Sequence, residues 1–168
     1  MSIAIKIKTF NIYVRSVFLY NSELWTLTEK LEESINVFQR RSLKKILGVY
    51  WPRKITNTEI YKRTKSIEWS KVVKRRRLSW LGHLLRLPVD TPARKALQEY
   101  IRPVKKKVGR PKTTWFRQIY DDLKGNVVNV NFKDEYTMIK DLDIICKNRT
   151  VWNKIIRSIM LDEPTSMQ

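Results

Sequence analysis

Two pairs of carboxylates are the residues of this chain that come closest to a catalytic pattern. Asp121 and Asp122 directly follow Tyr120, and Asp141 and Asp143 flank one apolar residue. The polymerase motif that holds Mg²⁺ has a residue between its Tyr and its acids and lies on a β-hairpin turn. Neither pair here has the third carboxylate of two-metal chemistry. We therefore expect Asp121 and Asp122 to be surface charges on a helix, and neither pair to form a nuclease or polymerase centre.

The single histidine and the single cysteine exclude several kinds of site. Cys146 has no second cysteine for a disulfide or a thiolate zinc site, and His83 has no second histidine for a two-histidine metal motif. On a helix His83 neighbours Trp80 and follows Gly82, which favours a packing role over that of a general base. Glycine inside a helix costs about 1 kcal/mol relative to alanine, so Gly82 predicts the close approach of another segment. We expect no catalytic residue, no cofactor and a reducing intracellular compartment.

Positive charge is the dominant property of the sequence. The formal net charge is +19, which favours a polyanionic partner, either nucleic acid or an anionic membrane surface. Residues 125–168 contain six basic and six acidic residues, so the whole excess lies in residues 1–124. From Arg40 to Arg77 there are fourteen basic residues against two acidic ones. We interpret this regional charge as a surface for phosphates, with a merely soluble basic surface as the alternative.

The cations expected to contact nucleic acid lie in three blocks, two on helices and one in a loop. These residues are Arg40, Arg41, Lys44 and Lys45; Lys71, Lys74, Arg75, Arg76 and Arg77; and Lys105, Lys106, Lys107, Arg110 and Lys112. For the helical blocks the alternative is a solvated charged face. Gly109-Arg110-Pro111 matches the centre of an AT-hook, but Val108 replaces the cation before the glycine. We therefore favour phosphate contacts over minor-groove reading, with a nuclear-import patch as another alternative.

The apolar period predicts a mainly α fold, a helical bundle of about six to eight helices with a basic loop containing Pro and Gly near 102–112. We expect helices over about 5–21, 28–47, 57–63, 67–87, 92–100, 114–124, 133–147 and 149–161. Thr28 and Thr56 occupy N-cap positions, and Gly48 occupies a position at which a helix ends. Phe10, Val14, Val17 and Phe18 are expected to face a core. Residues 127–132 are compatible with a short strand or a loop.

The domain organisation follows from the break at the basic loop. We predict a basic helical domain over 1–101, a linker over 102–112, a C-terminal helical part over 113–161 and a disordered tail over 162–168. No apolar run is long enough for a membrane span, and no secretory signal is present. The basic, acid-free start up to Glu23 is also compatible with a mitochondrial presequence, although its apolar spacing favours a core-facing helix.

Several ordered blocks resemble the region that follows the polymerase domain in non-LTR (LINE-type) retrotransposon proteins, the endonuclease-reverse transcriptases. The blocks are Phe18–Leu27, Phe38–Gly48, Thr56-Asn57, Arg75–Leu87 and Gly109–Trp115, with a weaker one at Asn148-Arg149 and Trp152. Their order and spacing match over about residues 6–124. Asn21 stands where the family usually has glycine and Ser42 where many members have cysteine.

The resemblance implies that this chain binds RNA template or target DNA without performing chemistry. The family's endonuclease and its polymerase palm with the catalytic aspartates are absent from the sequence, and the upstream polymerase region is an expected partner in a full-length protein. Trp80, Gly82, His83 and Trp115 belong to the matched blocks and are expected to be structural. We expect the chain in the nucleus or the cytoplasm. The alternatives are a truncated, non-functional or protein-interaction remnant of a transposable element, and a membrane-surface binder.

Overall fold

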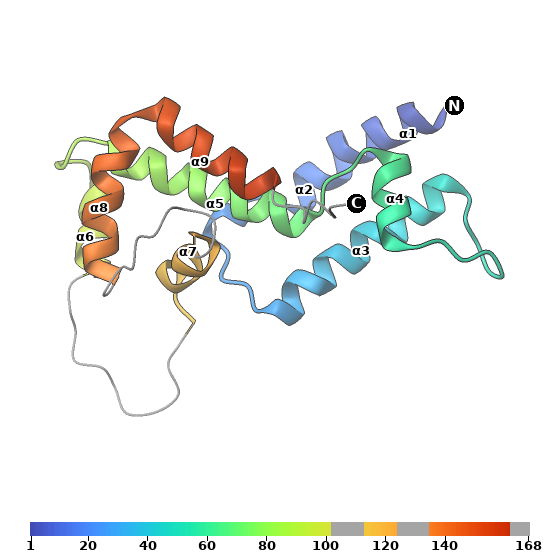
Figure 1. Ribbon diagram of the computed structural model, residues 1–168, viewed down its shortest axis with the longest axis horizontal. Coiled ribbons are helices and arrows are strands. Elements are labelled where there is room, and N and C mark those ends of the chain that lie inside the picture. The colour runs from blue at the N-terminus through green and yellow to red at the C-terminus, as the bar shows by residue number, and fades with distance from the viewer. Residues whose placement is uncertain (102–112, 124–134, 162–168) are drawn as a thin grey trace, which may run out of the picture. The chain divides into compact units, whose positions relative to one another are not determined.

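The computed structural model describes residues 1–101, 113–123 and 135–161, and every regular element within these ranges is a helix (Figure 1). The predicted mainly α fold is therefore confirmed for the described part of the chain. The predicted basic loop near 102–112, the segment 127–132 and the tail 162–168 lie outside the described residues. The contacts of the chain divide it into two compact units, unit 1 with residues 1–74 and unit 2 with residues 75–168.

The helices of unit 1 pack around α3, which contacts both α1 and α4 (Figure 1). In chain order the elements are α1 (Ile3–Thr9), a π-helix (Phe10–Arg15), α2 (Ser16–Phe18), a 3₁₀-helix (Ser22–Leu24), α3 (Glu29–Leu47), α4 (Asn57–Thr64) and the start of α5 (Trp69–Arg86).

The N-terminal helical run contains a π-helical segment that the sequence did not predict. A π-helical hydrogen bond spans five residues instead of four, so it shifts the following side chains around the helix axis. Phe10 and Phe18 pack into the core of unit 1 as predicted, but Val14 and Val17 are exposed. The expectation that Val14 and Val17 face the core was wrong, because it assumed a regular α-helical period throughout.

Local capping signals set the boundaries of α3 and α4. Thr28 Oγ1 accepts a hydrogen bond from the backbone N–H of Leu31 at 3.4 Å, and Gly48 ends α3 with a left-handed φ of 68°. Thr56 Oγ1 accepts a hydrogen bond from the backbone N–H of Glu59 at 3.3 Å and begins α4. The predicted caps of both helices are thus confirmed, although the Glu59 carboxylate pairs with a side chain further along α4 instead of returning to Thr56.

Aromatic rings meet in the unit 1 core, and the partly exposed ring of Phe38 packs at its edge. Trp69, at the start of α5, is fully buried, and the ring of Phe10 stacks on it with a centroid separation of 5.5 Å. Phe18 and Phe38 stack on each other at 4.7 Å and meet Trp69 at tilted angles. Ring pairs of this kind add to the free energy gained from burial alone. They join the N-terminal helical run, α3 and the start of α5 within unit 1.

Two amide side chains of α3 hold the beginning of α5. Gln39 Oε1 accepts a hydrogen bond from Trp69 N at 2.9 Å, and Gln39 Nε2 donates to Ile67 O at 2.8 Å. Asn36 Oδ1 accepts from Ser70 N at 3.0 Å, while Asn36 Nδ2 donates to Ser70 Oγ at 2.9 Å. The first N–H groups of a helix have no partner within it. Here a neighbouring helix satisfies them, which fixes the first turn of α5 on α3.

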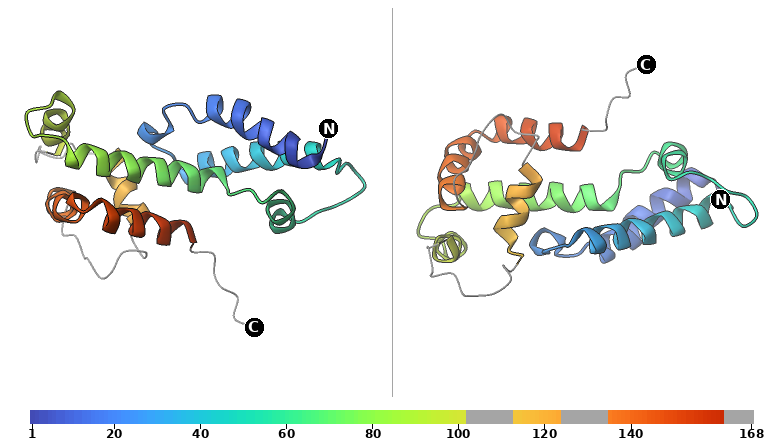
Figure 2. Two further views of the ribbon diagram at one scale, coloured as in Figure 1. Left: turned by 90° about the horizontal axis from the view of Figure 1, so that it is seen from above. Right: turned by 60° about the horizontal axis from the view of Figure 1, so that its bottom comes forward.

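Unit 2 contains the rest of α5 and the helices α6 (Pro92–Ile101), α7 (Trp115–Leu123), α8 (Glu135–Lys147) and α9 (Arg149–Leu161). The predictions for these helices agree with the structure to within about two residues at each end. α9 lies alongside the part of α5 that belongs to unit 2 (Figure 2). The core of unit 2 is apolar, and its fully buried members include Leu78, Leu81, Ile119, Met138 and Leu142.

The division between the units falls earlier than the domain boundary predicted at the basic loop. Leu78, Leu81 and Leu97 share one core with Ile119 and Leu142. Residues 75–101 therefore belong with the C-terminal helices and not with residues 1–74. The composition of residues 102–112 is a property of the sequence alone, whereas the boundary of a compact unit depends on which apolar side chains share a core.

Gly82 lies where another segment comes close, as predicted. A Cβ at this position would lie 2.5 Å from Cδ1 of Trp152 on α9 and closer still to its Nε1. The indole Nε1 donates a hydrogen bond to Leu78 O at 3.1 Å, which holds the ring against α5. Trp80 and Trp115, the two tryptophans predicted to be structural, are half-buried and pack against the same core.

We expect Gly82→Ala to lower the free energy of unfolding by about 1–3 kcal/mol, as measured by urea denaturation followed by circular dichroism. The added methyl group must displace the Trp152 ring and its hydrogen bond to Leu78. Alanine favours a helix by about 1 kcal/mol over glycine, so a net loss can only come from the clash. Ser79→Ala, at an exposed position of the same helix, is the control and should change stability by less than about 0.5 kcal/mol. A Gly82→Ala variant as stable as the unaltered chain would contradict the packing described here.

Candidate nucleic-acid interface

The two consecutive pairs of cations on α3 divide between solvent and the protein interior. Arg41 and Lys45 are exposed and Lys44 is half-buried, whereas Arg40 is buried and forms an ion pair with Glu33. Burial disfavours the charge of Arg40, but its side-chain hydrogen bonds outweigh this effect and raise the pKa of the guanidinium. Arg40 is therefore a structural cation of unit 1. Of the first predicted block, Arg41, Lys44 and Lys45 remain accessible to phosphates.

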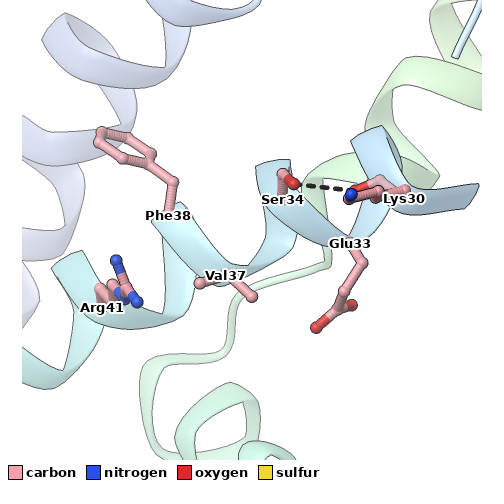
Figure 3. Close-up of a pocket in the computed structure, with 6 residues that line it drawn as sticks. All are labelled: Lys30, Glu33, Ser34, Val37, Phe38 and Arg41. Carbon is pink, nitrogen blue, oxygen red and sulfur yellow. Dashed lines mark hydrogen bonds between the residues drawn. The ribbon is translucent and has the colours of Figure 1, made fainter. Parts of the chain in front are cut away.

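The exposed side of α3 carries a shallow groove that includes Arg41 (Figure 3). Its lining residues are Lys30, Glu33, Ser34, Val37, Phe38 and Arg41. The Ser34 hydroxyl donates to the backbone carbonyl of Lys30 at 2.8 Å and is thus already engaged. Because a single helix supplies all the lining residues, the groove is open to solvent and does not enclose a small molecule as an enzyme pocket does. We interpret it as part of an extended surface.

The cations of α5 differ in how far their side chains are exposed to solvent. Arg75 is exposed, and Lys71, Lys74 and Arg76 are half-buried. Lys74 Nζ lies 3.8 Å from a carboxylate oxygen of Glu32 on α3, within unit 1. These four cations remain candidates for phosphate contacts along the helix. The third predicted block, with Lys105, Lys106, Lys107, Arg110 and Lys112, lies outside the described residues.

Arg77 does not belong to this surface, which corrects its predicted role. Its side chain is fully buried, and Arg77 Nη1 lies 2.5 Å from Asp122 Oδ2 on α7. The expectation that Asp121 and Asp122 are both surface charges is also wrong for Asp122, which is 7% exposed. Asp122 lies on the same side of α7 as Ile119 and Leu123, the side that faces the core of unit 2. Asp121 is exposed, as predicted.

The other side chains that could take part in chemistry are His83, Cys146 and Asp143, and each is engaged in contacts within the protein. His83 is exposed, and its ring stacks on Trp80 with a centroid separation of 5.3 Å. Burial raises the pKa of the Cys146 thiol to about 12, so the thiol stays protonated at neutral pH. Asp143 lies 2.6 Å from Arg94, a second buried guanidinium of unit 2. Among the described residues, no cluster of His, Cys, Asp or Glu is placed to hold a metal ion.

Further exposed cations lie in unit 1 outside the predicted blocks. Arg53 and Lys54 lie in the connection between α3 and α4, and Lys62 and Lys65 lie on α4 and at its end. They extend the accessible positive charge of unit 1 beyond α3. The signal for the first two was visible in the sequence, because residues 34–58 contain no acidic residue.

Comparisons of the chain with protein-family models, with curated proteins and with solved structures give no match. Within the described ranges, no helix has the length and apolar character needed to cross a bilayer. Function is therefore inferred from the charges, burial and contacts of the chain's own residues.

We expect Asp122→Ala to lower the free energy of unfolding by about 3–5 kcal/mol, because it removes the buried carboxylate that faces the Arg77 guanidinium. Asp121→Ala is a matched control, since it removes the same charge from the same helix. Asp121 lies 3.6 Å from Arg117 on the surface, and such exposed pairs contribute at most about 1 kcal/mol. Urea denaturation followed by circular dichroism distinguishes the two variants. Equal stabilities of the two variants would show that Asp122 is not the carboxylate that stabilises Arg77.

Proposed function

We propose that this chain is a nucleic-acid-binding accessory fragment of a retrotransposon-type RNA-directed DNA polymerase. In this proposal it contacts the phosphates of RNA template or target DNA and carries no catalytic residues of its own. One observation carries the proposal: of the fourteen basic residues from position 40 to position 77, only Arg40 and Arg77 are buried. The other twelve are exposed or half-buried and can reach a ligand in solution.

Few acids oppose these cations. The same stretch contains only Glu59 and Glu68. The Glu59 carboxylate lies 2.6 Å from Arg63 on α4 and is engaged with that side chain. The excess of cations repels itself in the absence of a polyanion, whereas phosphates neutralise it and release their condensed counterions. A polyanion is therefore the partner that this surface favours.

The positions of the acidic side chains support binding over catalysis. Asp122 is paired with Arg77 inside unit 2, and Asp143 is paired with Arg94. A carboxylate held by a buried guanidinium is poorly available to a Mg²⁺ ion. The open groove on α3 likewise offers a surface and not an enclosed site.

The packing of the sequence blocks supports the retrotransposon assignment. The Arg75–Leu87 block and the weaker block at Asn148-Arg149 and Trp152 lie far apart in the sequence, yet the Trp152 indole packs on Gly82 and bonds to Leu78. Residues that match a family pattern at two distant places thus form one contact. A chain of this kind would act beside an upstream polymerase region, in the nucleus or the cytoplasm.

We expect the chain to bind structured RNA, single-stranded DNA and nicked duplex DNA with an affinity whose logarithm falls steeply with the logarithm of the salt concentration. The double variant Arg41→Gln/Lys45→Gln removes two exposed cations of α3. It should reduce the slope of this plot by about two, because each lost phosphate contact reduces it by about one. Fluorescence anisotropy with labelled oligonucleotides over a salt series measures both quantities.

The matched control is Lys147→Gln/Lys154→Gln, which removes two exposed cations from the electrically neutral C-terminal part. It produces the same change in net charge and should leave the slope nearly unaltered. A flat salt response of the unaltered chain would contradict the proposed function. Equal effects of the two double variants would show that net charge, and not the surface of α3, determines binding.

A further inference from the structure

The connection between α3 and α4 exposes two adjacent aromatic side chains. Trp51 is 90% exposed and Tyr50 is 63% exposed. The other five tryptophans of the chain are buried or half-buried. Because burial of a large aromatic ring is strongly favourable, an indole left in water is a typical anchor for a partner.

Backbone hydrogen bonds define the shape of this connection. Val49 N donates to Lys44 O at 3.0 Å and ties the beginning of the connection to the last turn of α3. Arg53 N donates to Tyr50 O at 2.9 Å and closes a four-residue turn that carries Trp51 at its second position. The connection projects beyond the helices of unit 1 in Figures 1 and 2. The turn therefore presents the indole to solvent on an ordered backbone.

The charges around the turn identify the class of partner. Arg53 and Lys54 follow the aromatic pair and are exposed, and Lys45 is exposed on the last turn of α3. No acidic residue occurs in residues 34–58, which contain six basic ones. The partner must therefore combine negative charge with flat apolar faces. Unpaired nucleobases on a phosphate backbone have both properties.

We infer that the turn from Tyr50 to Lys54 is a stacking site for unpaired bases of single-stranded nucleic acid. Trp51 and Tyr50 stack on the bases, and Lys45, Arg53 and Lys54 contact the flanking phosphates. In a duplex the bases stack on one another and their faces are not available. The inference rests on the proposed function and adds to it that this part of the surface recognises a single strand.

The test compares the affinities of the unaltered chain and of Trp51→Ala for two DNA ligands by fluorescence anisotropy. One ligand is an oligothymidylate of about 20 nucleotides, which does not fold on itself, and the other is a blunt duplex of the same length. Trp51→Ala should weaken binding to the single strand about tenfold and binding to the duplex less than about twofold. Trp51→Phe keeps an aromatic face and should retain most of the affinity for the single strand.

Tyr20→Ala is the matched control, because Tyr20 is another exposed aromatic residue of unit 1, 73% exposed, and lies outside the turn. It should leave both affinities unchanged. Since Trp51 makes little contact with the core, circular dichroism and urea denaturation of Trp51→Ala should match those of the unaltered chain.

The outcomes separate this inference from the proposed function. If the unaltered chain binds neither ligand, the proposed function fails and the stacking site fails with it. If the chain binds both ligands with steep salt dependence, but Trp51→Ala weakens both equally or weakens neither, only the stacking site is wrong. A loss of affinity with Tyr20→Ala equal to that with Trp51→Ala would also overturn the stacking site, because the effect would then not be specific to the turn.

Discussion

A guanidinium that has lost all contact with water must be matched by a carboxylate, and in unit 2 the Arg77–Asp122 pair meets this requirement at 2.5 Å. α5 carries four consecutive cations, Lys74–Arg77, and several of its sides could in principle have turned inward. Transfer of an unmatched charge into the interior costs on the order of several kcal/mol, which favours the orientation that brings Arg77 to Asp122. The same orientation turns Leu78 and Leu81 into the core and leaves Arg75 in solvent. The burial of Arg77 thus determines which cations of α5 remain accessible to solvent.

The positions of the helices were predictable because their signals are local. Thr28, Gly48 and Thr56 act on backbone groups within a few residues of themselves, and a spacing of three or four apolar residues is visible in any short window. It was harder to predict which side of each helix faces the core. Val14 and Val17 are exposed because a π-helical segment precedes or contains them. Asn36 and Gln39 hold the first N–H groups of a helix whose bonded residues follow them by 34 and 30 positions. For the candidate site, Arg41 and Lys45 were predictable from charge alone, but the burial of Arg77 depends on a carboxylate from α7.

In the described part of the chain, every buried cation is an arginine. The buried cations are Arg40, Arg77 and Arg94, and no lysine is buried among the described residues. The physical reason is hydration, because a guanidinium is more weakly hydrated than an ammonium group and its planar fork can satisfy a carboxylate with directed hydrogen bonds. Lysine retains its charge in water, where a phosphate backbone can reach it. Because Arg40 is buried and paired with Glu33, Arg40→Lys is not a conservative change, whereas its neighbour Arg41 is exposed and has no such constraint.

The buried Cys146 thiol is unreactive in the folded chain, and it can therefore report on the opening of unit 2. The chain has no other thiol, and this one lies in the core of unit 2. A thiol-specific reagent can therefore react only when unit 2 opens, and the rate of modification measures the frequency of that opening. The aromatic core of unit 1 contains no such group. Labelling kinetics followed beside the amide hydrogen exchange of α3 would show whether the two cores open together or one after the other.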